Sequence, residues 1–132
     1  MEIIRINYQD ADLVYEFLSY CDESLKTFRY FDKRKAEDVL KDHIVTLLAM
    51  YEGRPIGYAH LDKDGEKIWL GICIADKYRG LGLGTKLMKE LMEYRPKGKP
   101  ILLTVDGDNK AAIKLYAKHG FLEKTLIMEN SL

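Results

Sequence analysis

The hydrophobic and polar positions of this chain follow two periods. Apolar side chains recur at helical spacing in four stretches, which predict helices at 10–22, 33–42, 83–94 and 109–118. Between them lie apolar runs rich in strand formers, which predict strands at 3–6, 44–51, 56–61, 67–74, 101–105 and 121–128. This order predicts a mixed α/β (α+β) fold with about four helices, in one domain that covers residues 1–132.

The connections between these elements predict which strands of the sheet are antiparallel and which are parallel. Turn residues at Glu52–Pro55 and Asp62–Gly65 join successive strands into an antiparallel meander. The strand at 67–74, the next helix and the strand at 101–105 form a β-α-β unit, so those two strands should be parallel. Because no turn residue divides 122–132, we expect one terminal strand rather than a hairpin. An exposed sheet edge is usually covered or paired, so pairing of two copies in a homodimer is a hypothesis.

The composition narrows the classes of partner. The chain has 21 basic and 21 acidic residues, so it carries no charge surplus for nucleic acid or for an acidic membrane surface. The N-terminus does not resemble a signal peptide, and no apolar run is long enough to span a bilayer. Cys21 and Cys73 lie in apolar surroundings, so we expect a reduced pair in the cytoplasm. No Cys/His cluster has metal-ligand spacing, and no metal is expected.

A candidate binding motif is the glycine-rich loop between a predicted strand and a predicted helix. Arg79 opens this loop, and glycines follow at positions 80, 82 and 84. Backbone N–H groups at the start of a helix, together with the helix dipole, form an anion site suited to a phosphate or a pyrophosphate. The dinucleotide fingerprint does not fit, because Thr85 stands where its third glycine is required. The P-loop does not fit either, because the chain has no Gly-Lys-Ser/Thr tripeptide.

A third template fits and carries a resemblance to a known family. Residues 79–84, Arg-Gly-Leu-Gly-Leu-Gly, resemble the motif [Q/R]-x-x-G-x-[G/A], the acyl-CoA pyrophosphate loop of the GNAT N-acyltransferase superfamily. Residues 109–121 resemble its second signature, N-x-x-A-x-x-L-Y-x-x-x-G-F. The resemblance covers roughly residues 44 to 128. It implies a mostly antiparallel sheet with one parallel strand pair at the acyl-CoA cleft, and here the usual C-terminal hairpin would be reduced to one strand.

The resemblance implies transfer of an acetyl group from acetyl-CoA to a primary amine, which attacks the thioester directly. Tyr116 matches the general acid that protonates the departing thiolate. The positions that match the cofactor site are Ile72 and Ile74 (through their backbone), Arg79, Gly80, Gly82, Gly84, Thr85 and Asn109. For Asn109 a helix N-cap is an equally good interpretation.

The general base is harder to place. His60 is the first candidate, because imidazole titrates near neutral pH and the residue lies on a central strand. Glu66 and Asp76 flank the next strand and are alternatives. His43 and His119 are expected at the periphery.

The acceptor is expected at the aromatic and basic connector between the first two helices. Phe28, Arg29 and Tyr30 are the candidate substrate-binding residues, since rings suit the face of a sugar and arginine suits phosphate. This favours a small-molecule amine such as an amino sugar. A peptide or lysine amine remains open, and a polyamine is least favoured because the connector has few carboxylates. Alternatively, Phe28 and Phe31 only anchor the connector. A non-catalytic CoA-binding or sensor module is the second candidate function.

Overall fold

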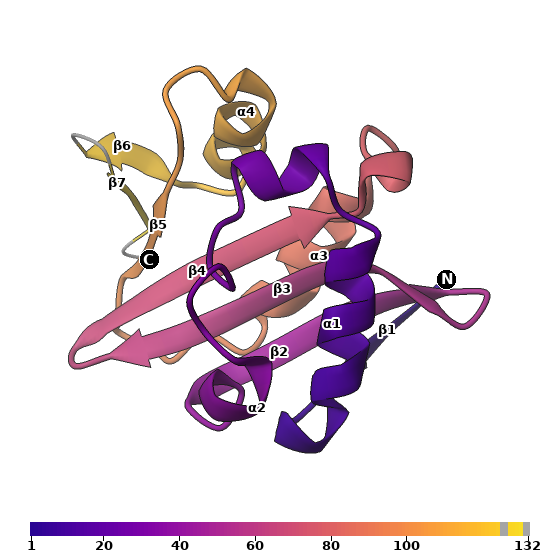
Figure 1. Cartoon of the computed structure of the whole chain (residues 1–132). Helices are drawn as coiled ribbons and strands as arrows, with labels where there is room; N and C mark the ends of the chain where they lie inside the picture. Colours follow the sequence, from indigo (N-terminus) through magenta and orange to yellow (C-terminus); the bar gives the residue numbers. More distant parts are fainter. Residues whose placement is uncertain (125–126, 131–132) are drawn as a thin grey trace.

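The strands form one twisted sheet that runs through the middle of the molecule. The computed structural model describes residues 1–124 and 127–130, and over these residues the strand order is β1-β2-β3-β4-β5-β7-β6 (Figure 1). The strands are β1 (Glu2–Arg5), β2 (His43–Tyr51), β3 (Arg54–Asp64), β4 (Lys67–Ile74), β5 (Ile101–Thr104), β6 (Leu122–Lys124) and β7 (Ile127–Asn130). The sheet is antiparallel except between β4 and β5. The predicted meander and the parallel pair are therefore confirmed.

Helices cover both faces of this sheet. They are α1 (Ala11–Ser19), α2 (Ala36–Val39), α3 (Leu83–Met92) and α4 (Lys110–Lys118), with short 3-10 turns η1 (Tyr8–Asp10), η2 (Glu23–Lys26) and η3 (Asp76–Tyr78). Figure 1 shows α1 across one face and α3 behind the other. Alternation along each strand divides the core accordingly. Leu48 and Tyr58 pack under α1, whereas Leu47 and Ala59 pack under α3.

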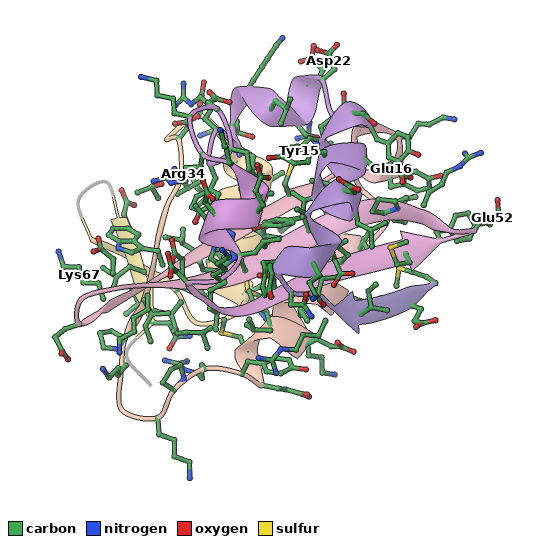
Figure 2. All side chains as sticks on the ribbon, turned by 60° about the horizontal axis from the view of Figure 1, so that its bottom comes forward. Tyr15, Glu16, Asp22, Arg34, Glu52 and Lys67 are labelled. Atoms are coloured by element: carbon green, nitrogen blue, oxygen red, sulfur yellow. The ribbon has the colours of Figure 1, made fainter. Side chains whose placement is uncertain are left out.

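The second predicted helix is much shorter than its apolar spacing suggested. Only the single turn α2 forms within 33–42, and a side chain of α1 fixes its position. Tyr15, labelled in Figure 2, accepts a hydrogen bond from the Ala36 N–H (3.1 Å) and donates one to the Glu37 carboxylate (2.6 Å). Residues 27–35, which precede α2, form no helix or strand, and we call them the connector.

The prediction of a single terminal strand is wrong. The chain forms two antiparallel strands there, and Leu122 of β6 pairs with Glu129 of β7. The reason lies in the sheet, because β7 has an antiparallel partner in β5 over the whole length from Ile101 to Thr104. This pairing aligns the terminal strand without a Gly or Pro turn signal. Residues 125–126, between β6 and β7 in the sequence, lie outside the described part of the chain.

The parallel pairing between β4 and β5 is short. It covers only two residue pairs, Ile68 with Ile101 and Trp69 with Leu102. Over the described residues, no strand pairs with the end of β4 from Gly71 to Ile74 on the side away from β3. The two strands therefore separate toward their carboxyl ends, where open α/β sheets bind their ligands.

One carboxylate ties residues 22–24, which lead into the connector, to the end of β4. Asp76 accepts hydrogen bonds from the backbone N–H groups of Asp22 (3.0 Å), Glu23 (2.8 Å) and Ser24 (2.9 Å). The Ser24 hydroxyl donates to the Ile74 carbonyl (2.6 Å). The Ser24 hydroxyl beside the carboxylate, with these backbone donors, lowers the pKa of Asp76 to about 2. The connector is thus held against the mouth of the separated strands.

The contact between α3 and β3 gives a first test. A Cβ at Gly57 would lie 2.8 Å from Leu87 Cδ1 and 3.2 Å from Leu83 Cδ2. Gly57→Ala should therefore lower the free energy of unfolding by about 1–3 kcal/mol through overpacking. Gly107→Ala is the matched control, because nothing lies within 4 Å of its Cβ position. Urea unfolding of both variants measures the difference, and equal stabilities would contradict the close packing described here.

The Asp76 contacts give a second test, through pH. The pKa of Asp76 is lower in the folded protein than the value of about 3.9 in an unfolded chain, so its stabilisation is present above about pH 4. It is lost as the pH falls toward 2. Asp76→Asn should be less stable than wild type at pH 7, and the two curves should converge below about pH 3. Asp64→Asn, which removes an exposed carboxylate on the same sheet, should keep the wild-type slope.

Candidate active site

Two cavities meet where β4 and β5 separate. The smaller one, about 290 Å³, lies between the end of β4, the glycine loop and α4, and we call it the donor cavity. The larger one, about 920 Å³, lies between the connector and the paired ends of β3 and β4, and we call it the acceptor cavity. The residues that border both cavities are Thr27, Phe28, Ile72, Thr104, Val105, Asp106 and Tyr116.

The glycine loop forms one wall of the donor cavity. Gly80 (φ +78°) and Gly82 (φ +81°) have left-handed backbone conformations, which side chains disfavour. Gly82 is the N-cap of α3, so the first turn of this ten-residue helix points its free N–H groups into the loop. Arg79, Gly84 and Thr85 line the same cavity. The structure thus brings together the loop residues predicted from the sequence, and they suit a pyrophosphate.

The opposite wall of this cavity is the end of β4. The Ala75 N–H donates to the Ile56 carbonyl of β3 (2.9 Å), and backbone directions alternate along a strand. The N–H and C=O groups of Ile72 and Ile74 therefore point away from β3, toward the cavity. The Ile74 carbonyl accepts the Ser24 hydroxyl, which leaves the Ile72 groups and the Ile74 N–H for an amide-containing ligand.

The helix α4 contributes residues at both of its ends. The Asn109 side chain caps the helix by accepting from the Ala112 N–H (3.3 Å), and the residue also lines the donor cavity. Both interpretations of Asn109 are therefore compatible with its position. Tyr116 is buried, and its ring packs on Phe121 with centroids 6.1 Å apart. Burial raises the pKa of Tyr116 to about 12, so the phenol carries its proton at neutral pH.

The predicted connector residues line the acceptor cavity. Phe28 borders both cavities, while Arg29 and Tyr30 border the larger one. Phe28 also packs on Tyr58, with ring centroids 5.5 Å apart, so it anchors the connector as well. The Arg34 guanidinium stacks on the Tyr30 ring at 4.3 Å (Arg34 is labelled in Figure 2) and donates to the Tyr30 carbonyl. This stacking holds the aromatic edge of the cavity in place.

Two histidines come together beside the acceptor cavity, and one of them borders it. His60 borders the cavity, and its ring centroid lies 4.4 Å from that of His43 and 4.3 Å from that of Tyr30. His43 was expected at the periphery, but its strand pairs with β3 so that the two rings share one face. Burial lowers the pKa of both imidazoles, that of His60 far below its ordinary value. The role of His60 as a base stays a prediction.

The alternative bases from the sequence lie elsewhere. Glu66 is exposed in the β3–β4 turn, where its carboxylate is 3.4 Å from the Lys99 ammonium. Asp76 is engaged by the three backbone N–H groups described above. Neither residue borders a cavity.

Sequence reasoning missed the carboxyl groups that border the acceptor cavity, which are those of Asp42, Asp62, Asp64 and Asp106. Asp62 borders this cavity and accepts a hydrogen bond from the Tyr30 hydroxyl (2.9 Å). The turn signal Asp-Lys-Asp-Gly predicts Asp62 in a turn, but β3 continues through Asp64. The two-residue spacing between His60 and Asp62, which places both on one strand face, was the available signal.

The two cysteines are also neighbours, although they are far apart in the sequence. Both thiols are free and buried, and Cys73 borders the donor cavity. The adjacent Cys21 thiol, together with burial, raises the pKa of the Cys73 thiol.

Among the described residues, no helix has the length and apolar character needed to cross a bilayer.

Comparison with known proteins agrees with this geometry. The 34% identical probable spermine N(1)-acetyltransferase of Bacillus subtilis subsp. natto matches over 98 residues, 64% of each chain. The L-amino acid N-acetyltransferase AaaT of Escherichia coli is 31% identical over 86 residues, 59% of this chain and 53% of that one. The chain thus spans less than two thirds of the length of these relatives.

Solved structures share the fold. The ribosomal-protein-S18-alanine N-acetyltransferase of Escherichia coli aligns with a TM-score of 0.78 at 22% identity, over 98% of this chain and 92% of that one. The PaiA N-acetyltransferase of Thermoplasma acidophilum, solved in complex with coenzyme A, gives a TM-score of 0.72 at 20% identity, over 99% and 98%. The sequence model of the Acetyltransferase (GNAT) family matches residues 9–121. This chain therefore belongs to the acetyltransferase (GNAT) family.

Proposed function

We propose that this protein transfers an acetyl group from acetyl-CoA to the primary amine of a small molecule. The observation that carries the proposal is the meeting of two cavities at Ile72 and Tyr116, one of them built for an anion and the other open to an acceptor. The relatives named for spermine and for L-amino acids support a small amine as the acceptor. A cytoplasmic location and a homodimer stay predictions from the sequence.

The donor cavity has the groups that the cofactor requires. Arg79 and the N–H groups of the loop from Gly80 to Thr85 would hold the pyrophosphate, with Asn109 at the far side of the cavity. The backbone of Ile72 and Ile74 would hold the amides of the pantetheine arm. When bound, the cofactor supplies an acetyl thioester, which a neutral amine can attack.

Tyr116 is proposed as the proton donor to the leaving thiolate. It borders both cavities, and its phenol is protonated at neutral pH because burial raises its pKa to about 12. No hydrogen bond joins its hydroxyl to another described residue, so the proton is available to a ligand. A thiolate that receives this proton departs as a neutral thiol.

A non-catalytic CoA sensor is the second candidate, and a peptide amine is the second acceptor. The acceptor cavity argues against a sensor, because a sensor has no need of a second chamber lined by charged side chains. An amino sugar is one member of the small-molecule class, suited to the rings of Phe28 and Tyr30 and to the arginines beside them.

Binding of the donor is tested by thermal unfolding with acetyl-CoA. Saturation at about 100 times Kd should add about 2.7 kcal/mol to the free energy of unfolding. Arg79→Ala should reduce this shift at a fixed concentration, while Arg29→Ala, on the acceptor side, should leave it unchanged. If the wild-type protein shows no shift at millimolar acetyl-CoA, the proposed CoA site is excluded. If it binds, the release of free thiol with a panel of amines distinguishes an enzyme from a sensor.

The role of Tyr116 is tested by removal of one oxygen atom. Tyr116→Phe should lower kcat by about 10²- to 10⁴-fold, because the thiolate loses its proton donor. The affinity for acetyl-CoA, measured by the same thermal shift, should stay near the wild-type value. Tyr94→Phe is the control, since this partly exposed tyrosine borders neither cavity. Turnover that is equal in all three proteins would exclude Tyr116 from the mechanism.

A further inference from the structure

The two ring nitrogens of His60 have different surroundings. Nδ1 lies 2.6 Å from the Tyr58 hydroxyl. Tyr58 is fully buried on the central strand β3, and among the described residues its hydroxyl has no other hydrogen-bond partner. A buried hydroxyl that fails to donate its proton costs about 1–3 kcal/mol. The Tyr58 hydroxyl therefore donates to Nδ1 of His60.

This hydrogen bond determines where His60 carries its own proton. Burial keeps the imidazole neutral, since its pKa is far below the ordinary value, and it keeps Tyr58 protonated. A neutral imidazole has one N–H and one acceptor nitrogen. Because Nδ1 accepts from Tyr58, the proton is on Nε2. A nitrogen that already carries a proton is a donor and has no lone pair with which to act as a base.

Nε2 lies at the edge of the acceptor cavity, beside the point where the two cavities meet. His60 pairs with Gly71 across the β3–β4 ladder, and a Cβ at Gly71 would lie 2.6 Å from Nε2. Gly71 also borders the cavity and directly precedes Ile72. No hydrogen bond joins Nε2 to another described residue, and the atom is not sealed in the core. His60 is 2% exposed and borders the cavity, so this N–H is the group that a ligand there would pair with.

The same reasoning gives the direction of the hydrogen bonds that end at Asp62, on the same face of β3 as His60. Tyr30 donates its only hydroxyl proton to Asp62 (2.9 Å), so the His43 contact at 2.8 Å must be an Nε2–H that donates to the Tyr30 oxygen. His43 Nδ1 then accepts from the Thr46 hydroxyl (2.9 Å). This series of hydrogen bonds runs without a break from Thr46 through His43 and Tyr30 to Asp62, and it orients the carboxylate. Among the described residues Asp62 has no ion pair.

We propose that His60 is a neutral hydrogen-bond donor to the acceptor molecule, and that Asp62 is the base that takes the proton of the acceptor ammonium. In this step an N–H bond of the ammonium breaks, an O–H bond forms on the Asp62 carboxylate, and the nitrogen lone pair becomes free to attack. The proposal rests on the acetyltransferase function proposed above, and it replaces His60 as the candidate base.

This arrangement indicates the class of acceptor. The N–H of His60 needs an oxygen or another acceptor atom, while Asp62 needs an ammonium. A primary amine with a hydroxyl or carboxylate oxygen nearby, as in an amino sugar, an amino alcohol or an amino acid, offers both. A protonated polyamine offers only N–H donors, so the His60 N–H would be left unpaired beside it, at a cost of about 10- to 100-fold in affinity.

The first experiment needs no acceptor. Long-range ¹H–¹⁵N spectra of the wild-type protein at pH 7 should show His60 with its proton on Nε2 and a bare Nδ1. In Tyr58→Phe the proton should redistribute between the two nitrogens, because Nδ1 has lost its donor. A wild-type His60 that carries the proton on Nδ1, or on both nitrogens, would overturn the proposal, whatever the result of the acetyl-CoA binding test.

The second experiment separates a donor from a base. The Gln side chain can place an N–H near the Nε2 position but has no basic nitrogen. His60→Gln should therefore keep kcat/KM for D-glucosamine or an L-amino acid within about tenfold of wild type, while His60→Ala should lose about 10- to 100-fold. Asp62→Asn should lose about 10²-fold or more in kcat with the same acceptors. All three variants should keep the thermal shift with acetyl-CoA.

Three results would contradict the roles proposed for His60 and Asp62, the acceptor class or the proposed function, and each points to a different one. Equal losses in His60→Gln and His60→Ala, with Asp62→Asn near wild type, would return the role of base to His60. A kcat/KM for spermidine above that for every oxygen-bearing amine tested would overturn the acceptor class. Failure of the wild-type protein to bind acetyl-CoA would instead remove the proposed function, and the spectra would still report the state of His60.

Discussion

The structure depends on the separation of β4 from β5 after two residue pairs. A parallel strand pair that continued would satisfy the backbone of Ile72 and Ile74 internally and leave no opening between the cavities. Because the pairing stops at Trp69, the end of β4 has polar backbone groups that face a cavity. The donor loop, the end of α4 and the connector are all placed around this opening.

The separation is stabilised from both sides of the sheet. On the side of α1, Asp76 and Ser24 hold the connector to the end of β4. On the other side, α3 packs so closely on β3 that a Cβ at position 57 would lie 2.8 Å from Leu87 Cδ1. The cluster of buried side chains under each helix layer then makes the sheet a rigid support. Ile72, Ile74 and His60, which border the cavities, are carried by strands of this sheet.

The parts of the site predicted from the sequence have two sources. The loop after Arg79 could be predicted as an anion site because a strand, a turn and a helix that follow one another place their residues without long-range information. Tyr116 could be predicted through the resemblance of residues 109–121 to the second signature of the family. Asp62 and His43 could not, because their neighbours come from the connector through Tyr30, which is more than ten residues away in the chain. The terminal hairpin was missed for the same reason, since β5 and not a turn residue aligns it.

The two cavities share much of their lining but not all of it. The connector residues Thr27 and Phe28 and the end of β4 at Ile72 border both cavities, so a change there alters the donor side as well. The tip of the β3–β4 hairpin, from Asp62 to Asp64, borders the acceptor cavity and not the donor cavity. This tip can therefore be exchanged to alter recognition of the acceptor while the lining of the donor cavity stays in place.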